Sequence, residues 1–255
     1  MVANSSTTQD ERDRSNELRI KAENYLARAG FDWNADFSLF LRRQSISRIL
    51  YLADLYRKVT DVPGYILELG CRWGPSLSVF QALRGIYEPY NYTRGVIGFD
   101  TFEGFVGTSG TDGSGISDGG LASDPSHVDE LNAVLSLLAQ DSPLPHLVET
   151  RAIKGDVRVT LPAWLDENPH AAIAMVVFDM DIHAPTKAAL RAVIPRLSAG
   201  FLVVFDEFLT KAFPGESVAV FESLLLSNIR FERSPLAPDR CLVPLGRRTL
   251  GFGVT

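Results

Sequence analysis

Two apolar runs in the second half of the chain each end in a pair of acidic residues. Residues 174–178 (Ala-Met-Val-Val-Phe) run into Asp179-Met-Asp181. Residues 201–205 (Phe-Leu-Val-Val-Phe) run into Asp206-Glu207. Short, continuously apolar runs are typical of strands that are buried on both faces of a parallel sheet. Because open α/β sheets bind ligands at the carboxyl ends of their strands, these acids are candidate site residues.

The segment between the two runs predicts how the strands are arranged. Residues 184–200 have the pattern of one helix that ends at Gly200. A strand–helix–strand unit of this length makes the two strands parallel and usually makes them neighbours. The four acids would then converge at one edge of the sheet, where like charges need a cation, a shared proton or solvent. Of these three, a divalent metal ion is the most specific hypothesis.

The rest of the pattern alternates strands with helices, which indicates the α/β class. Further strands are predicted near residues 64–69, 95–100 and 147–154. Helices are predicted over residues 16–28, 37–58, 75–85, 128–140 and 216–227. In residues 157–165, Pro162 suggests a turn or the start of a helix. Residues 231–234 and 248–254 are expected to form an antiparallel pair that closes the sheet.

Composition divides the chain into three regions. Residues 1–15 are polar and charged, so we expect them to be disordered or frayed. Residues 16–62 form the expected N-terminal helical cap, and residues 63–255 the sheet domain. Within that domain residues 104–126 are rich in Gly, Ser and Asp, and they are too long for an ordinary connection. They are expected to act as a lid over the site.

Charge and cysteine content exclude several classes of protein. The net charge of −6 disfavours a nucleic-acid binder, which would carry a basic face. No apolar stretch approaches the about 20 residues of a membrane span, and the N-terminus has no apolar leader. Cys71 and Cys241 are the only cysteines, too few for a disulfide framework or a zinc site. We therefore expect a cytoplasmic enzyme that binds neither membranes nor nucleic acid.

The turn after the first predicted sheet strand has the form of a nucleotide-binding turn. It spaces Gly70 and Gly74 four residues apart, and Glu68 lies two residues before the first glycine. This spacing differs from Gly-x-Gly-x-x-Gly, which cradles a pyrophosphate, so it suits a cofactor without phosphate. Arg72 and Trp73 lie within the turn, and Trp73 could either pack on a cofactor or fill the core. A purely structural turn is the alternative reading of the motif.

Two further strand ends extend this pattern. Asp100 ends the second strand and is placed to accept both hydroxyls of a ribose. Gly155 and Asp156 follow the third strand and could close over the edge of an adenine. Each feature also has a structural reading, as a helix N-cap or a simple turn. Their recurrence at three consecutive strand ends favours a nucleoside site.

Three motifs resemble those of a known family. The segment Asp100-Thr-Phe-Glu-Gly104 is similar to an Asp-Ser-Phe-x-Gly motif, and Asp179-Met-Asp-Ile-His183 to Asp-Gly-Asp-Met-Tyr. Phe205-Asp-Glu207 is similar to Val-Asp-Asp. These belong to the class I S-adenosylmethionine-dependent methyltransferases, and within them to the macrocin-type, metal-dependent sugar O-methyltransferases. The chain most resembles the TDP-rhamnose 3-O-methyltransferases of calicheamicin-type enediyne biosynthesis. It departs from the family in having Glu207 for Asp and His183 for Tyr.

The resemblance covers residues 64–254 and implies both fold and cofactor. The fold would be a Rossmann-like, mostly parallel sheet with an antiparallel C-terminal strand. The cofactors would be S-adenosylmethionine and Mg²⁺, and the protein would be a homo-oligomer. The residues expected to bind S-adenosylmethionine are Glu68, Gly70, Arg72, Trp73, Gly74, Asp100, Thr101, Phe102, Gly155, Asp156 and Asp179.

The acidic strand ends would supply the chemistry. We expect Asp179, Asp206 and Glu207 to bind the metal, because hard oxygen ligands favour Mg²⁺. Solvated helix caps are the alternative. The proton of the acceptor hydroxyl needs a base, and here Asp179 and His183 rank equally, with Asp181 behind them.

The function that follows is transfer of the methyl group of S-adenosylmethionine to a sugar hydroxyl. The expected acceptor is the 3-OH of a TDP-activated deoxyhexose such as TDP-rhamnose, in natural-product biosynthesis. Two other acceptors stay open, a catechol-like diol and a completed glycoside. A third alternative is a non-catalytic binding protein that keeps the methyltransferase fold.

Overall fold

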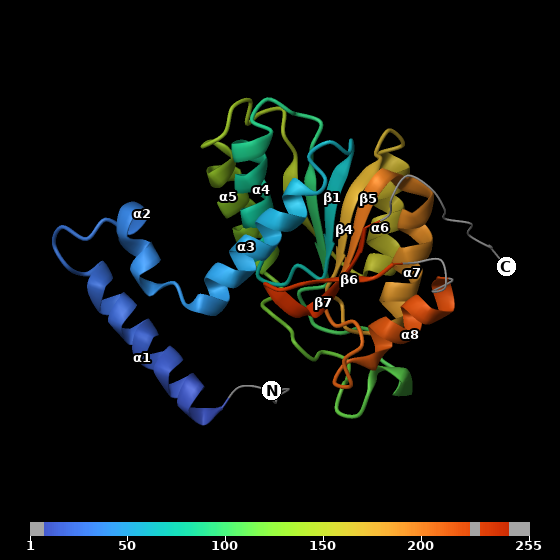
Figure 1. Ribbon diagram of the computed structural model, residues 1–255, viewed down its shortest axis with the longest axis horizontal. Helices are drawn as coiled ribbons and strands as arrows, with labels where there is room; N and C mark the ends of the chain where they lie inside the picture. Colours follow the sequence, from blue (N-terminus) through green and yellow to red (C-terminus); the bar gives the residue numbers. More distant parts are fainter. Residues whose placement is uncertain (1–7, 225–229, 245–255) are drawn as a thin grey trace.

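The computed structural model describes residues 8–224 and 230–244, and these form a seven-stranded sheet with helices on both faces (Figure 1). The strands run in the order β3-β2-β1-β4-β5-β7-β6. Strands β1 to β5 are parallel, whereas β7 is antiparallel to β5 and to β6. This confirms the expected mostly parallel sheet with an antiparallel closure. The strands are β1 (Tyr65–Leu69), β2 (Val96–Asp100), β3 (Thr150–Lys154), β4 (Ile173–Phe178), β5 (Leu197–Phe205), β6 (Glu232–Ser234) and β7 (Ala237–Pro244).

The helices divide into two layers around the sheet and a separate N-terminal part. One face is covered by α3, α4 and α5, and the other by α6, α7 and α8. Within the described ranges, none of the helices has the length and apolar character needed to span a bilayer. The helices are α1 (Gln9–Leu26), α2 (Trp33–Asp36), η1 (Phe37–Phe40), α3 (Arg43–Arg57), α4 (Pro75–Tyr87), η2 (Gly110–Asp112), α5 (His127–Ala139), α6 (Val157–Glu167), α7 (His183–Val193), η3 (Ile194–Arg196) and α8 (Pro214–Ser223).

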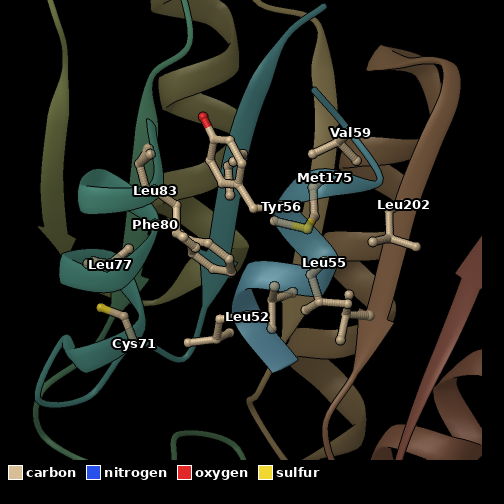
Figure 2. Packing of buried hydrophobic residues seen from close by; sticks show 14 of the residues in the cluster. Leu52, Leu55, Tyr56, Val59, Cys71, Leu77, Phe80, Leu83, Met175 and Leu202 are labelled. Carbon is tan, nitrogen blue, oxygen red and sulfur yellow. The ribbon is translucent and has the colours of Figure 1, made fainter. Parts of the chain in front are cut away.

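The core forms because the central strands are apolar on both faces. In β1, Ile66 packs into the cluster under α3 and α4, whereas its neighbour Leu67 packs into the cluster under α6 and α7. Figure 2 shows the first cluster, in which Leu55 of α3 lies among Phe80 of α4 and Met175 of β4. Helix α3, which lies within the predicted helical cap of residues 16–62, therefore contributes side chains to the core of the sheet domain.

The N-terminal helix differs from its prediction. Helix α1 begins at Gln9 rather than residue 16, because Thr8 and Glu11 form a capping box that satisfies the first backbone N–H groups. Residues 9–15, which were expected to be disordered or frayed, belong to this helix. No residue of α1 is buried, and Figure 1 shows α1 standing away from the sheet.

Three other predicted boundaries are corrected. Residues 37–58 are not one helix, because η1 is followed by extended backbone at Leu41 and Arg42 before α3 begins. The helix predicted over residues 184–200 ends at Val193, since Pro195 has no N–H to continue it. Gly200 lies inside β5 with φ of +89° and caps no helix.

Two further sequence expectations concern Pro162 and the C-terminal strands. Pro162 lies inside α6, which begins five residues earlier at Val157, so it marks neither a turn nor a helix start. Strand β6 pairs with β7, whereas the sequence predicted a pairing of residues 231–234 with residues 248–254. Residues 248–254 lie outside the described part of the chain.

Candidate functional site

A cavity of about 540 Å³ lies at the carboxyl ends of β1 to β5. It is centred where β1 and β4 meet, which is the point at which the strand order reverses. Open α/β sheets bind their ligands at this switch point, and the volume suits a small molecule. The structure thus brings the predicted strand-end residues to one cavity.

The first glycine of the turn is required by the close approach of two strand ends. The Gly70 N–H donates to the carbonyl of Phe99 at 2.8 Å, and the Asp179 N–H donates to the carbonyl of Leu69 at 2.8 Å. A Cβ on Gly70 would lie 1.9 Å from the carbonyl oxygen of Asp179. Only glycine fits between β1 and β4 here. Gly74, by contrast, caps α4 with φ of +77° and does not line the cavity.

Asp100 holds the two turns that form the cavity floor. Its Oδ2 accepts a hydrogen bond from the Arg72 backbone N–H at 2.7 Å, and its Oδ1 accepts one from the Phe102 N–H at 2.7 Å. Arg72 and Phe102 have φ of +46° and +58°, a conformation that few non-glycine residues adopt. Each carboxylate oxygen keeps a second lone pair, which a ribose hydroxyl can use.

The aromatic residues of these turns separate into two roles. Trp73 lines the cavity and is 50% exposed, with its ring edge-on to His127 at 4.7 Å, so the core-filling alternative is wrong. Phe102 is fully buried in the core and does not line the cavity, contrary to its expected role in cofactor binding. Thr101 does line the cavity, and its hydroxyl donates to the carbonyl of Gly104 at 2.6 Å.

Gly155 and Asp156 line the far end of the cavity, beyond β3. Asp156 is also the N-cap of α6, where it accepts a hydrogen bond from the Arg158 N–H at 2.9 Å. Hydrogen bonds from the Arg158 guanidinium lower the pKa of this carboxyl. Asp156 is therefore a helix N-cap, as the structural alternative predicted. A ligand bound to its carboxylate would do so beside Arg158.

A group of six carboxyl side chains, the acid cluster, surrounds the ends of β1, β4 and β5. Burial, followed by the charges of Asp206 and Asp181, raises the pKa of Asp179 well above its usual range. Burial together with Glu207 and Asp206 raises the pKa of Asp181 to about 7. Burial likewise raises the pKa of Glu68 to about 7. The acid cluster consists of Glu68, Asp179, Asp181, Asp206, Glu207 and Glu216.

Glu216 is the member of the acid cluster that sequence reasoning missed. It is fully buried in the first turn of α8, and its Oε1 accepts a hydrogen bond from the Glu207 N–H at 3.1 Å. Burial raises its pKa well above the usual range, which favours the protonated form. In the sequence it has only the form of an ordinary first-turn acid.

Two arginines from distant parts of the chain face the acid cluster. The Nε of Arg240, in β7, lies 2.8 Å from Oδ1 of Asp206. The Nη2 of Arg48, in α3, lies 3.9 Å from Oδ2 of Asp179. Both arginines line the cavity, and neither was predicted, because nothing local in α3 or β7 marks them as site residues.

The expected metal ligands are near one another but do not form a metal site as they stand. Among the residues that the structure describes, no three His, Cys, Asp or Glu side chains are grouped so that they could hold a metal ion. Asp179 and Asp206 are instead directed to Arg48 and Arg240. Their chemistry nevertheless fits, because buried, mutually repelling carboxyl groups are the hard oxygen donors that Mg²⁺ prefers. Magnesium binding stays a prediction.

Of the three candidate bases, the structure brings Asp179 and Asp181 to the cavity but not His183. The His183 ring lies against α8, with Nε2 2.9 Å from Oε2 of Glu222. Asp181 is 7% exposed and has φ of +65°, a strained conformation for a residue with a side chain. The left-handed turn at Asp181 directs the chain into α7 and carries His183 away from the cavity.

The segment of residues 104–126 forms one wall of the cavity. Its two arms pair where the Phe105 N–H donates to the Gly120 carbonyl at 3.0 Å and the Gly119 N–H donates to the Phe105 carbonyl at 2.9 Å. Gly104, Phe105, Val106, Gly120 and Leu121 line the cavity.

Comparisons with solved structures agree with this geometry. The chain is similar to CalS11, a calicheamicin methyltransferase, at 36% identity and a TM-score of 0.86 over 94% of each chain. It is also similar to the apo structure of CalS11, described as a TDP-rhamnose 3'-O-methyltransferase of calicheamicin biosynthesis, at 34% identity and a TM-score of 0.77 over 94% of this chain and 96% of that one. The O-methyltransferase NovP shares the fold at 19% identity and a TM-score of 0.58 over 79% of this chain and 81% of that one. No protein-family model and no curated protein matches the chain.

Proposed function

Because the chain belongs to the class I S-adenosylmethionine-dependent O-methyltransferases of the calicheamicin type, we propose that it methylates a hydroxyl group of a sugar in natural-product biosynthesis. The observation that carries the proposal is the order of side chains along one cavity. Asp156, Asp100 and Gly70 lie at the ends of β3, β2 and β1, and the acid cluster continues at β4 and β5. A nucleoside site thus adjoins a site for general base chemistry.

The cofactor would lie along the strand ends in this order. Its adenine would be near Asp156, its ribose hydroxyls on Asp100, and its amino-acid tail over Gly70 at the β1–β4 junction. The sulfonium methyl group would then face the acid cluster. Trp73, half exposed at the cavity wall, would cover the nucleoside.

In the reaction, an oxygen lone pair of the acceptor attacks the methyl carbon as the bond from that carbon to sulfur breaks. The bonding electrons go to sulfur, which becomes the neutral thioether of S-adenosylhomocysteine, and the hydroxyl proton goes to a base. Asp181 is the best-placed base, because it lines the cavity and is buried there. Asp179 is the second candidate.

The metal completes the proposal. Asp179, Asp206 and Glu207 would hold Mg²⁺, which supplies a Lewis acid that lowers the pKa of an alcohol. Arg48 lies beside Asp179 and Arg240 beside Asp206, so these arginines and the metal ion would offset the negative charge of the same carboxylates.

The proposed acceptor is the 3-OH of TDP-rhamnose or a closely related TDP-deoxyhexose. Support comes from the 34% identity to the CalS11 structure described as a TDP-rhamnose 3'-O-methyltransferase. A completed glycoside or a catechol-like diol would present the same vicinal oxygens to the acid cluster, so both belong in the test.

The test is turnover with S-adenosylmethionine and three acceptors: TDP-rhamnose, a rhamnosyl glycoside and a catechol. We expect formation of S-adenosylhomocysteine together with a TDP-sugar product heavier by one methylene unit. An Asp100→Asn variant serves as the control for cofactor-dependent turnover. If no sugar acceptor is methylated although the cofactor binds, sugar methylation is rejected.

A further inference from the structure

The end of the cavity that would receive the amino-acid tail of the cofactor is strongly acidic. Glu68, Asp179 and Asp181 line it, at and after the adjoining ends of β1 and β4. The tail of S-adenosylmethionine carries an α-carboxylate, which these acids would repel unless a cation lies between them. The cavity therefore needs a specific positive group at this end.

Arg48 lies at this point. It lines the cavity, and its Nη2 donates to Oγ of Ser76 at 2.9 Å and lies 3.9 Å from Oδ2 of Asp179. Ser76 is almost fully buried and also lines the cavity, as the second residue of α4. A hydroxyl and a guanidinium are thus paired beside the predicted tail position.

The guanidinium of Arg48 retains donors for a ligand. Among the described residues its Nε has no hydrogen-bond partner, although that atom is buried. The side chain as a whole is 36% exposed and so remains accessible from the cavity. A buried N–H without an acceptor is costly, and a carboxylate binds to such a planar fork of donors through two oxygens.

The other cavity arginines are placed for different tasks. Arg240 reaches the cavity from β7, at the β5 side of the acid cluster, where its Nε lies 2.8 Å from Asp206. Arg72 belongs to the turn that Asp100 holds, towards the ribose position. Arg48 is the arginine on the β1–β4 side of Glu68 and Asp179.

We propose that Arg48, together with Ser76, binds the α-carboxylate of the methionine tail of S-adenosylmethionine. This inference rests on the proposed function and deepens it. It makes α3, which precedes the sheet in the chain, a part of the cofactor site. The same guanidinium then separates the ligand carboxylate from Asp179, so that tail and acid cluster can be occupied together.

The test compares two nucleosides that differ in the tail. S-adenosylhomocysteine carries the α-carboxylate, and 5′-methylthioadenosine lacks the whole amino-acid part. In titration calorimetry, Arg48→Gln is expected to weaken S-adenosylhomocysteine by about 10- to 100-fold, the range for a lost charge-assisted hydrogen bond. Binding of 5′-methylthioadenosine should be unchanged. Arg43→Gln, an exposed arginine on the same helix, is the matched control and should leave both affinities unchanged.

A third ligand isolates the carboxylate itself. Decarboxylated S-adenosylhomocysteine keeps the amine of the tail, so wild type and Arg48→Gln should bind it equally. Arg48→Lys should recover part of the affinity for S-adenosylhomocysteine, because it restores the charge without the fork.

The outcomes separate this inference from the proposed function. Equal weakening of all three ligands by Arg48→Gln, or no weakening of any, overturns the role of Arg48 and leaves the function standing. Failure of the wild-type protein to bind either S-adenosylhomocysteine or 5′-methylthioadenosine rejects the function itself. A cooperative thermal melting transition above the temperature of the binding experiment, recorded for each variant, shows that the comparison is made on folded protein.

Discussion

The backbone N–H of His183 donates a hydrogen bond of 2.6 Å to Oδ1 of Asp112, which lies 71 residues earlier in the chain. Asp112 is fully buried, and its Oδ2 accepts from the Ser109 N–H at 2.7 Å. A Cβ on Gly215 would lie 2.1 Å from Oδ1 of Asp112. One carboxylate therefore ties the segment of residues 104–126 to the start of α7 by a hydrogen bond and packs against the start of α8.

The hydrogen bonds of Asp112 hold the segment of residues 104–126 in place as a wall of the cavity, and removing the carboxylate tests this role. Asp112→Ala removes the acceptor of two backbone N–H groups, which should lower the free energy of unfolding by about 1–3 kcal/mol. It should also speed protease cleavage within residues 104–126 and lower turnover. Asp118→Ala is the matched control, because Asp118 is exposed and accepts hydrogen bonds from the N–H and the hydroxyl of Thr108 within the same segment. Equal rates of protease cleavage in Asp112→Ala and in the wild type would show that Asp112 does not hold the segment in place.

Gly70 should tolerate no side chain. A Cβ there would lie 1.9 Å from the Asp179 carbonyl oxygen, so Gly70→Ala forces β1 and β4 apart. We expect a loss of about 3 kcal/mol or more, from overpacking added to backbone strain. Gly200→Ala is the control, since Gly200 has a similar φ but its Cβ would meet only the Val62 side chain, at 3.2 Å. Chemical denaturation that gives equal losses for the two variants would contradict this account of Gly70.

The candidate bases can be separated by two substitutions. Asp181→Asn should lower kcat by about 10²- to 10⁴-fold, the usual contribution of a general base. The same variant should melt at a higher temperature, because it removes a buried charge that Asp206 and Glu207 repel. His183→Ala should lower kcat far less, because its ring faces Glu222 outside the cavity. A larger kcat loss in His183→Ala than in Asp181→Asn would return the role of base to His183.

Metal dependence has a readout that does not depend on turnover. If the acid cluster binds Mg²⁺, then the ion should raise the melting temperature of the wild type in the absence of substrate. Asp179→Asn should reduce this rise, and chelator should abolish methyl transfer until Mg²⁺ is added back. Full activity in the presence of chelator would show that the arginines alone balance the acid cluster.

A buried ion pair outside the cavity makes stability depend on pH. Burial raises the pKa of Glu88. Hydrogen bonds from Arg94, Tyr56 and Asn91 together lower the pKa by more than burial raises it, so the net shift is downward. A carboxyl with a lowered pKa stabilises the fold above its unfolded-state pKa, and this stabilisation is lost as the pH falls through the folded-state value. Glu88→Gln should therefore be less stable than wild type near neutral pH. The difference should shrink below about pH 4, the ordinary range of a glutamate pKa. A constant difference from pH 3 to 7 in urea titrations would contradict this.

Local patterns were sufficient to predict the acidic strand ends. The apolar runs before Asp179 and Asp206 identify buried strands, and parallel strands bring their carboxyl ends to one edge whatever the details of packing. The same reasoning placed Asp100 and Asp156 at the cavity. These predictions depend only on strand direction and order.

Residues whose roles depend on packing between distant elements could not be predicted in this way. Arg48 and Arg240 reach the cavity from α3 and β7, and Glu216 reaches Glu207 from the start of α8. His183 was placed in the cavity because it is close to Asp181 in the chain. The backbone at Asp181 is left-handed and turns the chain away from the cavity before His183. The residue type at position 181 does not predict this conformation.

The pairing of Arg240 with Asp206 also has a consequence for the order of synthesis. The chain emerges from the ribosome with the parallel strands first, and β7 pairs with β5 only after about 240 residues have been made. Until then Asp206 lacks this arginine, and the edge of β5 is open to other chains. The β6–β7 hairpin, which is translated after the parallel strands, therefore also supplies the arginine that neutralises Asp206, so the charge of the acid cluster is balanced only once this hairpin has joined the sheet.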